Sequence, residues 1–442
     1  MKRHTITSVV AAVLVAAATS GCLRPEGVVT PAPGRPTVGE PASGPGAEPE
    51  PEPSAPALDE ELVQAEVTLA EADGFISSAN AALESGDDAQ WDTLLFVEGD
   101  DWHQQDAWFD GVQDVPMSER RFDLMSSSAG DDGDWRVEFV HQIDGADRVP
   151  VVESYRFTLG KTSAGDVGIT EVDGFGRAYP QLWDIGAIEV VVADSTVVLH
   201  QADADISDQL LAEIDKASAL TLEQWPVPEV DTMVVGLAPT EQMTVLFGGD
   251  DVEAAGFMSP IQTAEREDVG VGRVVLDLPY SVNELRYYDQ VDAGLPLMRH
   301  EGLHLGAAVA DGLLRGPEWA IEGLPTWWEG VDDEAVATDL FDYSEYSSRI
   351  SGLEPAWPPA DDSEFFNGDD EAIDRYYTDS ALVFAYIAQT YGEQAAVDLG
   401  SELNDASGST GEATEIAVQE YLGISAAQLQ ADWEAWAEEL AK

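Results

Sequence analysis

Two of the six histidines in this 442-residue chain lie four positions apart, in the segment Pro296-Leu-Met-Arg-His-Glu-Gly-Leu-His-Leu. Residues i and i+4 share one face of a helix, so His300 and His304 can direct two imidazoles at one metal ion. Glu301 lies between them, where a His-Glu-x-x-His arrangement places its general base. Chance produces this pattern in roughly one such histidine-poor chain in a hundred. The segment therefore predicts a helix that binds a metal ion and activates water.

A zinc site needs a third protein ligand, because two imidazoles leave its coordination incomplete. A second helix is expected to begin at Pro317, and it carries Glu318, Glu322 and Glu329. We expect Glu322, eighteen positions past His304, to be the third ligand. Glu329, about two helical turns further along the same face, is the alternative.

Around these residues the sequence resembles the gluzincin metallopeptidases, in particular the peptidase MA-like family. The pattern of that family is His-Glu-x-x-His followed, after a short spacer, by Trp-x-x-Glu-Gly-x-Ala. Trp319, Glu322 and Gly323 match the second half of this pattern. The chain departs from it at Pro325, where the family usually has Ala, and it has a helix-weakening Gly302 inside the first half.

The similarity extends to about residues 270–442, within a domain expected to span 180–442. It includes the stretches Tyr377-Thr-Asp-Ser380, Phe384, Tyr386, Tyr391-Gly392, Leu422-Gly-Ile-Ser and Asp432-Trp433. Family members often bind substrate as an added strand at the sheet edge before the motif helix, which here implies residues 274–278.

The resemblance implies a Zn²⁺ cofactor, a peptide or protein substrate and a hydrolytic mechanism. Zinc held by His300, His304 and Glu322 would keep one position open for water and lower the pKa of that water to about 7. Glu301 would take the proton as the water attacks a peptide carbonyl, and Tyr377 would stabilise the developing oxyanion. Tyr376 is adjacent to Tyr377, and an aromatic residue at this position can equally pack in a core.

Charge and composition exclude some other classes of protein. The chain has 20 Lys and Arg against 86 Asp and Glu, a formal net charge of −66, so no cationic surface is available to bind nucleic acid. An excess of carboxylates favours cationic peptides as substrates. With 12 Trp, 12 Tyr and 13 Phe, the chain has too much apolar surface for a disordered acidic protein.

The first 57 residues predict an anchor and a spacer. A basic start and an apolar run at 9–18 are typical of a secretory signal peptide, here residues 1–21. The ending Ala-Thr-Ser-Gly-Cys resembles the bacterial lipobox, which implies a lipid on Cys22, the only cysteine, and a location on the extracytoplasmic face of the cell membrane. The alternative is an ordinary signal peptide with an incidental cysteine. Residues 22–57 contain ten of the 24 prolines and predict an extended stalk.

The hydrophobic pattern of the remainder predicts an α+β fold in two domains. Residues 58–175 should form a helix-plus-antiparallel-sheet module, similar in pattern to the cystatin or nuclear-transport-factor cone folds, with helices at 58–86 and 89–96 and strands at 121–126, 135–142, 149–160 and 167–172. Residues 180–442 should form the zincin-like domain, with a hairpin at 188–192 and 196–200, a helix at 207–225, strands at 232–237, 243–247 and 273–278, and helices from 292 onward.

Together these features predict a membrane-anchored, extracytoplasmic zinc metallopeptidase. The alternative is a catalytically silent zincin-fold surface lipoprotein that acts as a binding or scaffold module.

Overall fold

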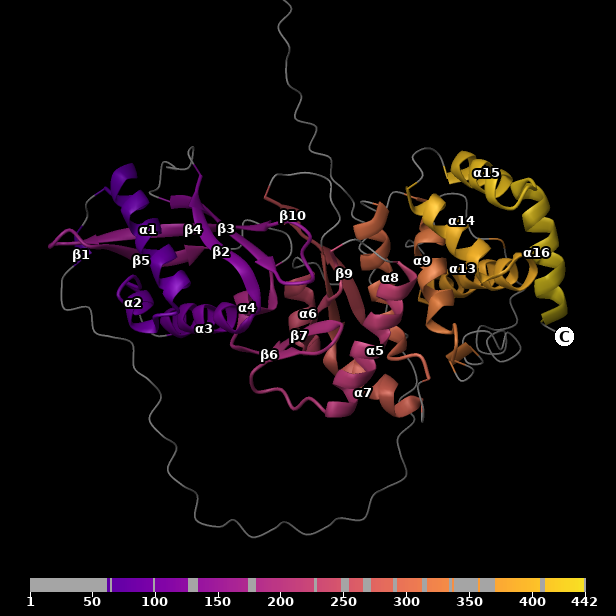
Figure 1. The fold of residues 1–442 in the computed structure, drawn as a ribbon, viewed down its shortest axis with the longest axis horizontal. Coiled ribbons are helices and arrows are strands. Elements are labelled where there is room, and N and C mark those ends of the chain that lie inside the picture. Colours follow the sequence, from indigo (N-terminus) through magenta and orange to yellow (C-terminus); the bar gives the residue numbers. More distant parts are fainter. Residues whose placement is uncertain are drawn as a thin grey trace, which may run out of the picture.

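In the computed structural model, two β-sheets and a helical C-terminal region follow one another along the longest axis of the molecule (Figure 1). The structure describes residues 62–63, 66–97, 100–125, 134–173, 180–225, 229–247, 254–264, 272–288, 292–311, 316–333, 336–337, 357, 370–405 and 410–440. The predicted signal peptide, Cys22 and the predicted stalk therefore lie outside the described residues. Two sheets combined with many helices make this an α+β protein, as predicted.

The first sheet is antiparallel, and it contains the predicted four-strand meander. Its strands β2 (Met117–Leu124), β3 (Asp134–Ile143), β4 (Val151–Thr162) and β5 (Val167–Asp173) pair in chain order. Side chains alternate along these strands, as the period of two predicts. Phe122 and Phe139 contact Trp108, and Phe157 contacts Phe122, so that the four buried rings form one aromatic cluster.

The helices of the first unit differ from the prediction at two places. Helix α1 (Leu69–Ser85) begins later than expected, because Thr68 and Glu71 form a capping box that fixes its first turn. Ahead of it, β1 (Leu62–Val63) pairs with the end of β4, so the helical prediction for this stretch is wrong. Helix α2 (Asp88–Asp92) was expected, whereas α3 (Asp100–Asp114) was not.

The second sheet has five strands in the order β6-β7-β8-β11-β9. The bounds are β6 (Ile188–Val192), β7 (Thr196–Gln201), β8 (Met233–Ala238), β9 (Gly256–Pro260) and β11 (Gly272–Asp277). The predicted hairpin of β6 and β7 is confirmed, and β7, β8 and β11 are parallel. Because β11 pairs with strands on both sides, the prediction that residues 274–278 form a sheet edge is wrong. The edge strand on this side is β9, which was not predicted.

A second correction concerns residues 243–247, for which a strand was predicted. They belong to the short helix α6 (Thr240–Leu246), which begins directly after Pro239. Met243 and Leu246 are buried three residues apart, as the face of a helical turn requires. A short apolar run fits both periods, so its pattern alone did not decide between strand and helix.

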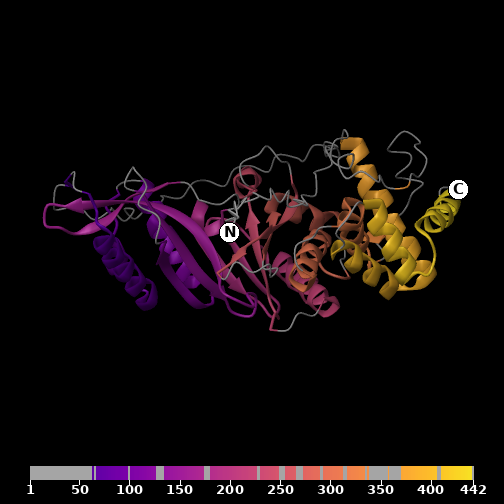
Figure 2. The same cartoon turned by 90° about the horizontal axis from the view of Figure 1, so that it is seen from above.

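Apart from one short strand, described below, the remaining elements are helices, as predicted for the chain from residue 292 onward (Figures 1 and 2). They are α4 (Leu182–Ile185), α5 (Asp208–Gln224), α7 (Leu278–Tyr287), α8 (Pro296–Asp311), α9 (Glu318–Glu329), α13 (Asp370–Tyr391), α14 (Glu393–Asp405), α15 (Thr410–Tyr421) and α16 (Ala426–Leu440). The last helix has a side-chain cap, since Gln428 N donates to Ser425 Oγ at 3.2 Å. Among the described helices, none combines the length and the apolar character that a bilayer crossing requires.

The two sheets are in direct contact. The short strand β10 (Gln262–Thr263) follows β9 along the chain but pairs with β4 of the first sheet. One continuous hydrophobic core includes Phe139 and Tyr155 of the first sheet together with Trp183, Leu199 and Phe257 of the second unit. The first sheet is therefore packed directly against the sheet that leads to the helical region.

Candidate metal centre

Helices α8 and α9 carry the predicted ligands. Helix α8 begins at Pro296 and ends at Asp311, so it contains the whole segment that was predicted to be helical. It lies between the second sheet and α9, and it packs on β9, β11 and α5 (Figure 1). Packing explains why the helix-weakening Gly302 occurs inside this motif. A Cβ added there would lie 3.3 Å from Met298 Cε and 3.4 Å from Thr221 Oγ1 of α5. The missing side chain thus lets α5 and α8 approach closely.

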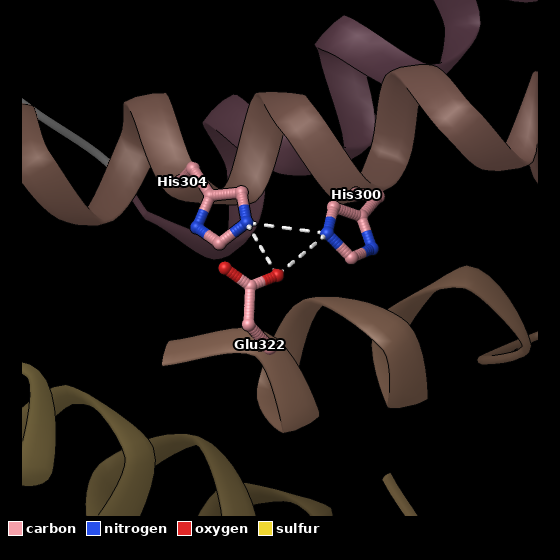
Figure 3. Close-up of side chains that lie close together, drawn as sticks. All are labelled: His300, His304 and Glu322. Atoms are coloured by element: carbon pink, nitrogen blue, oxygen red, sulfur yellow. Dashed lines mark hydrogen bonds and ion pairs between the residues drawn. The ribbon is translucent and has the colours of Figure 1, made fainter. Parts of the chain in front are cut away.

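The ligand atoms of His300, His304 and Glu322 converge from the two helices (Figure 3). The Nε2 atoms of the two histidines are 3.2 Å apart. Glu322 Oε2 lies 3.5 Å from His300 Nε2 and 3.6 Å from His304 Nε2. All three side chains are buried. The structure therefore brings together the three residues that the sequence selected as metal ligands.

The charge state of this group is the one that a metal requires. Burial raises the pKa of Glu322, but interactions with His304 and His300 outweigh it and leave the pKa below its usual value. Burial lowers the pKa of His304, against the opposing influence of Glu322. The site therefore presents an ionised carboxylate and a neutral His304, which are the forms that bind divalent metals.

The geometry also fits zinc. Ligand atoms about 2.1 Å from a tetrahedral zinc ion stand about 3.4 Å from one another. The three separations in the site, 3.2, 3.5 and 3.6 Å, agree with this value. Glu322 Oε1 has no hydrogen-bond partner among the described residues, and Oε2 meets only the two histidine nitrogens. A buried carboxylate with so few partners is costly unless a cation compensates it, so the residues present fit a metal ion.

Glu329, the alternative third ligand, has a different role. Its Oε1 lies 2.6 Å from Nδ1 of His300, the ring nitrogen that faces away from Glu322. A carboxylate in this place accepts a hydrogen bond from Nδ1–H, which leaves the Nε2 lone pair free for the metal and fixes the orientation of the ring. The neighbouring Arg299 donates to the Glu329 backbone carbonyl at 2.9 Å and lies 4.9 Å from the ring centre of Trp328. No motif or spacing indicated a role for Arg299.

Glu301 is fully buried on α8 and faces the second sheet. One residue along a helix is a turn of about 100°, so Glu301 lies about 60° around the helix from His304. Its side chain packs closely on Gly256 of the edge strand β9, where an added Cβ would stand 2.9 Å from Glu301 Cγ. This contact was not predicted, because β9 itself was not.

Tyr377 approaches the site from α13. Its ring centre lies 6.4 Å from that of His300. The closeness of α13 to α9 depends on Gly323, where an added Cβ would stand 2.7 Å from Cβ of Ser380. The family-like residues Gly323 and Ser380 thus form the helix contact that places Tyr377 beside the histidines. Tyr376 and Tyr377 both belong to the partly buried residues that pack on the helical core.

Helix α8 is held at its first turn by a residue that the sequence reasoning missed. Glu284 of α7 accepts a hydrogen bond from Leu297 N at 3.2 Å. Burial and the nearby Glu329 carboxylate raise the pKa of Glu284 to about 8. No motif or spacing singled out this glutamate, because its role depends on how α7 packs beside α8.

No protein-family model matches the chain, and a search among curated proteins gave no match either.

Proposed function

We propose that this chain is a zinc metallopeptidase with a zincin-like second domain of the gluzincin type. The observation that carries the proposal is the buried donor set of His300, His304 and Glu322, with Glu301 beside it on the same helix. The arrangement supports metal-assisted hydrolysis because it combines three converging ligand side chains with a carboxylate that is not one of them.

When bound, zinc would lower the pKa of a water molecule and polarise the scissile carbonyl. Glu301 accepts the proton of the attacking water and then passes it to the leaving amine. Glu329 holds the ring of His300 through Nδ1. Tyr377 is the candidate donor to the oxyanion, since α13 places its ring beside that of His300.

A peptide substrate would add to the second sheet at β9. Among the described strands, β9 is the last on the side of the sheet next to α8. An extended peptide can pair with the backbone of such an edge strand. Gly256 of β9 touches Glu301, so a peptide paired there would pass close to the general base. The proposed substrate-binding edge is therefore β9 and not residues 274–278, which lie inside the sheet.

The membrane location is also a proposal, and it rests on the lipobox-like residues before Cys22. A lipid on Cys22 would hold the enzyme at the extracytoplasmic face of the cell membrane, with residues 22–57 as the spacer.

One pair of variants tests the enzymatic proposal on protein that begins near Leu58. Glu301→Gln should keep about one zinc ion per chain and lose hydrolysis of a peptide library, because only the base is removed. His300→Ala should lose both zinc and activity. Zinc content can be measured by elemental analysis and cleavage by mass spectrometry.

Glu223→Gln, which removes an exposed carboxylate from α5, is the control and should leave both readouts unchanged. A wild-type protein that binds zinc but cleaves no member of a broad library would reject the peptidase. The scaffold or binding lipoprotein would then be the better account.

A further inference from the structure

The edge strand β9 approaches Glu301 at a glycine. A Cβ added to Gly256 would stand 2.9 Å from Glu301 Cγ, 3.2 Å from Glu301 Oε1 and 3.1 Å from Leu276 Cδ2. These distances are shorter than ordinary carbon contacts of about 3.5–4.0 Å. No other residue type fits here without displacing the Glu301 side chain or the strand.

Strand β9 is fixed to β11 on one side. Its backbone pairs antiparallel with β11 from Gly256 opposite Leu276 to Pro260 opposite Gly272. Asp277 N also donates to Ala255 O at 2.7 Å, just before β9 begins. The position of β9 therefore follows that of β11.

The far end of β9 is fixed to the first sheet. After β9 the chain enters β10, which pairs with β4 at Val151 and Val152. Between the two strands, Ile261 is buried against Val151. The first sheet thus holds the chain directly beyond β9.

A buried ion pair joins β11 to the first sheet as well. Arg273 Nη1 and Nη2 donate to Asp147 Oδ1 and Oδ2 at 2.6 and 2.8 Å, and both side chains are buried. Asp147 follows β3, and its Oδ2 accepts from Ile143 N at 2.8 Å. A bidentate pair of this kind fixes both distance and angle between the elements that carry it.

We propose that the first sheet helps to position Glu301. Through β10 and the Asp147–Arg273 pair it holds β9 in place, and Gly256 of β9 in turn sets the position of the Glu301 side chain. This inference rests on the proposed function, in which Glu301 is the general base. Asp147, Arg273 and Gly256 are positioning residues, because they act through Glu301 and not on the substrate.

The direct test is Gly256→Ala. We expect kcat to fall on the order of 10- to 100-fold, as a displaced catalytic group does. Zinc content and KM should stay close to wild type, since the added methyl points at Glu301 and not along the pairing edge of β9. Gly236→Ala on β8 is the matched control: its added Cβ has no neighbour closer than 3.8 Å, so kcat should not change.

A second readout does not depend on activity. In a double-mutant cycle on zinc-free protein, Gly256→Ala should lower Tm when Glu301 is present and lower it less in a Glu301→Ala background, because the Glu301 side chain is then absent. Equal Tm changes in both backgrounds, or a wild-type kcat for Gly256→Ala, would overturn the inference. If the wild type cleaves nothing, the proposed function fails, while the cycle still tests the contact.

Asp147→Asn tests the role of the first sheet. It keeps the size of the side chain but removes the charge that Arg273 requires. We expect a several-fold lower kcat with unchanged zinc content and KM. A joint loss of zinc and kcat, or no effect on kcat, would show that the ion pair does not position the base.

Discussion

At the scale of single residues, the assignment of the third ligand depends on which nitrogen of His300 each glutamate faces. Glu322 and Glu329 lie seven positions apart on one face of a helix. The sequence alone therefore allows either of them to reach the two histidines. Glu322 faces Nε2 of both histidines, whereas Glu329 meets Nδ1 of His300 only. The two carboxylates therefore have different expected effects on metal binding.

Glu329→Gln should weaken zinc binding about 10- to 100-fold, because the ring of His300 loses its carboxylate partner but keeps its place. Glu322→Gln should weaken it more, since a ligand is lost. A competition titration with a chelator measures both affinities, with Glu223→Gln as the control. If Glu329→Gln lowered the affinity more than Glu322→Gln, the two roles would have to be exchanged.

At the scale of elements, local patterns predicted the site better than the sheet. The His-Glu-x-x-His helix, its Pro296 start and the following helix with Glu322 all depend on short-range spacing, and the structure has them. The edge strand β9 was missed because it is five residues long and ends in proline. The order of the strands could not be predicted either, because no local feature of residues 274–278 indicates that another strand, β9, pairs beside them at the end of the sheet. Consequently the contact between Gly256 and Glu301 could not be predicted.

Glu284 lies at the N-terminus of helix α8, and its contribution to the stability of the fold should depend on pH. Glu284 has a pKa of about 8 in the folded chain against an ordinary value of 4.5. Between these values the folded state binds the proton more tightly, so this group's contribution to the free energy of unfolding falls as pH rises. The slope has an upper limit of about 1.4 kcal/mol per pH unit.

Glu284→Gln should make the stability of zinc-free protein less dependent on pH, because the amide oxygen can still accept from Leu297 N without titrating. Urea unfolding at several pH values from 5 to 8 measures this dependence. The wild type should lose more stability than the variant across the range. Parallel pH profiles for the two proteins would exclude the role of Glu284.

At the scale of the whole molecule, the boundary predicted near residue 175 separates two sheets but not two cores. Trp183 and Leu199 of the second unit belong to the same hydrophobic cluster as the aromatic side chains of the first. Polar contacts cross the boundary too: the Tyr155 hydroxyl donates to Asp184 Oδ1 at 2.7 Å, and Gln104 Nε2 donates to Asp184 O at 2.8 Å. The first unit should therefore contribute to the stability of the second.

Truncation tests this dependence. A fragment of residues 180–442 would expose the apolar side chains that face the first sheet and would remove Asp147, the ion-pair partner of Arg273. We expect the fragment to unfold without a cooperative transition and to bind a hydrophobic dye, whereas a chain of residues 58–442 unfolds cooperatively. Calorimetry and dye fluorescence distinguish the two, and the chain of residues 58–442 serves as the control. A fragment that unfolds cooperatively at the Tm of the longer chain would show that the second unit folds on its own and that its stability does not depend on the first sheet.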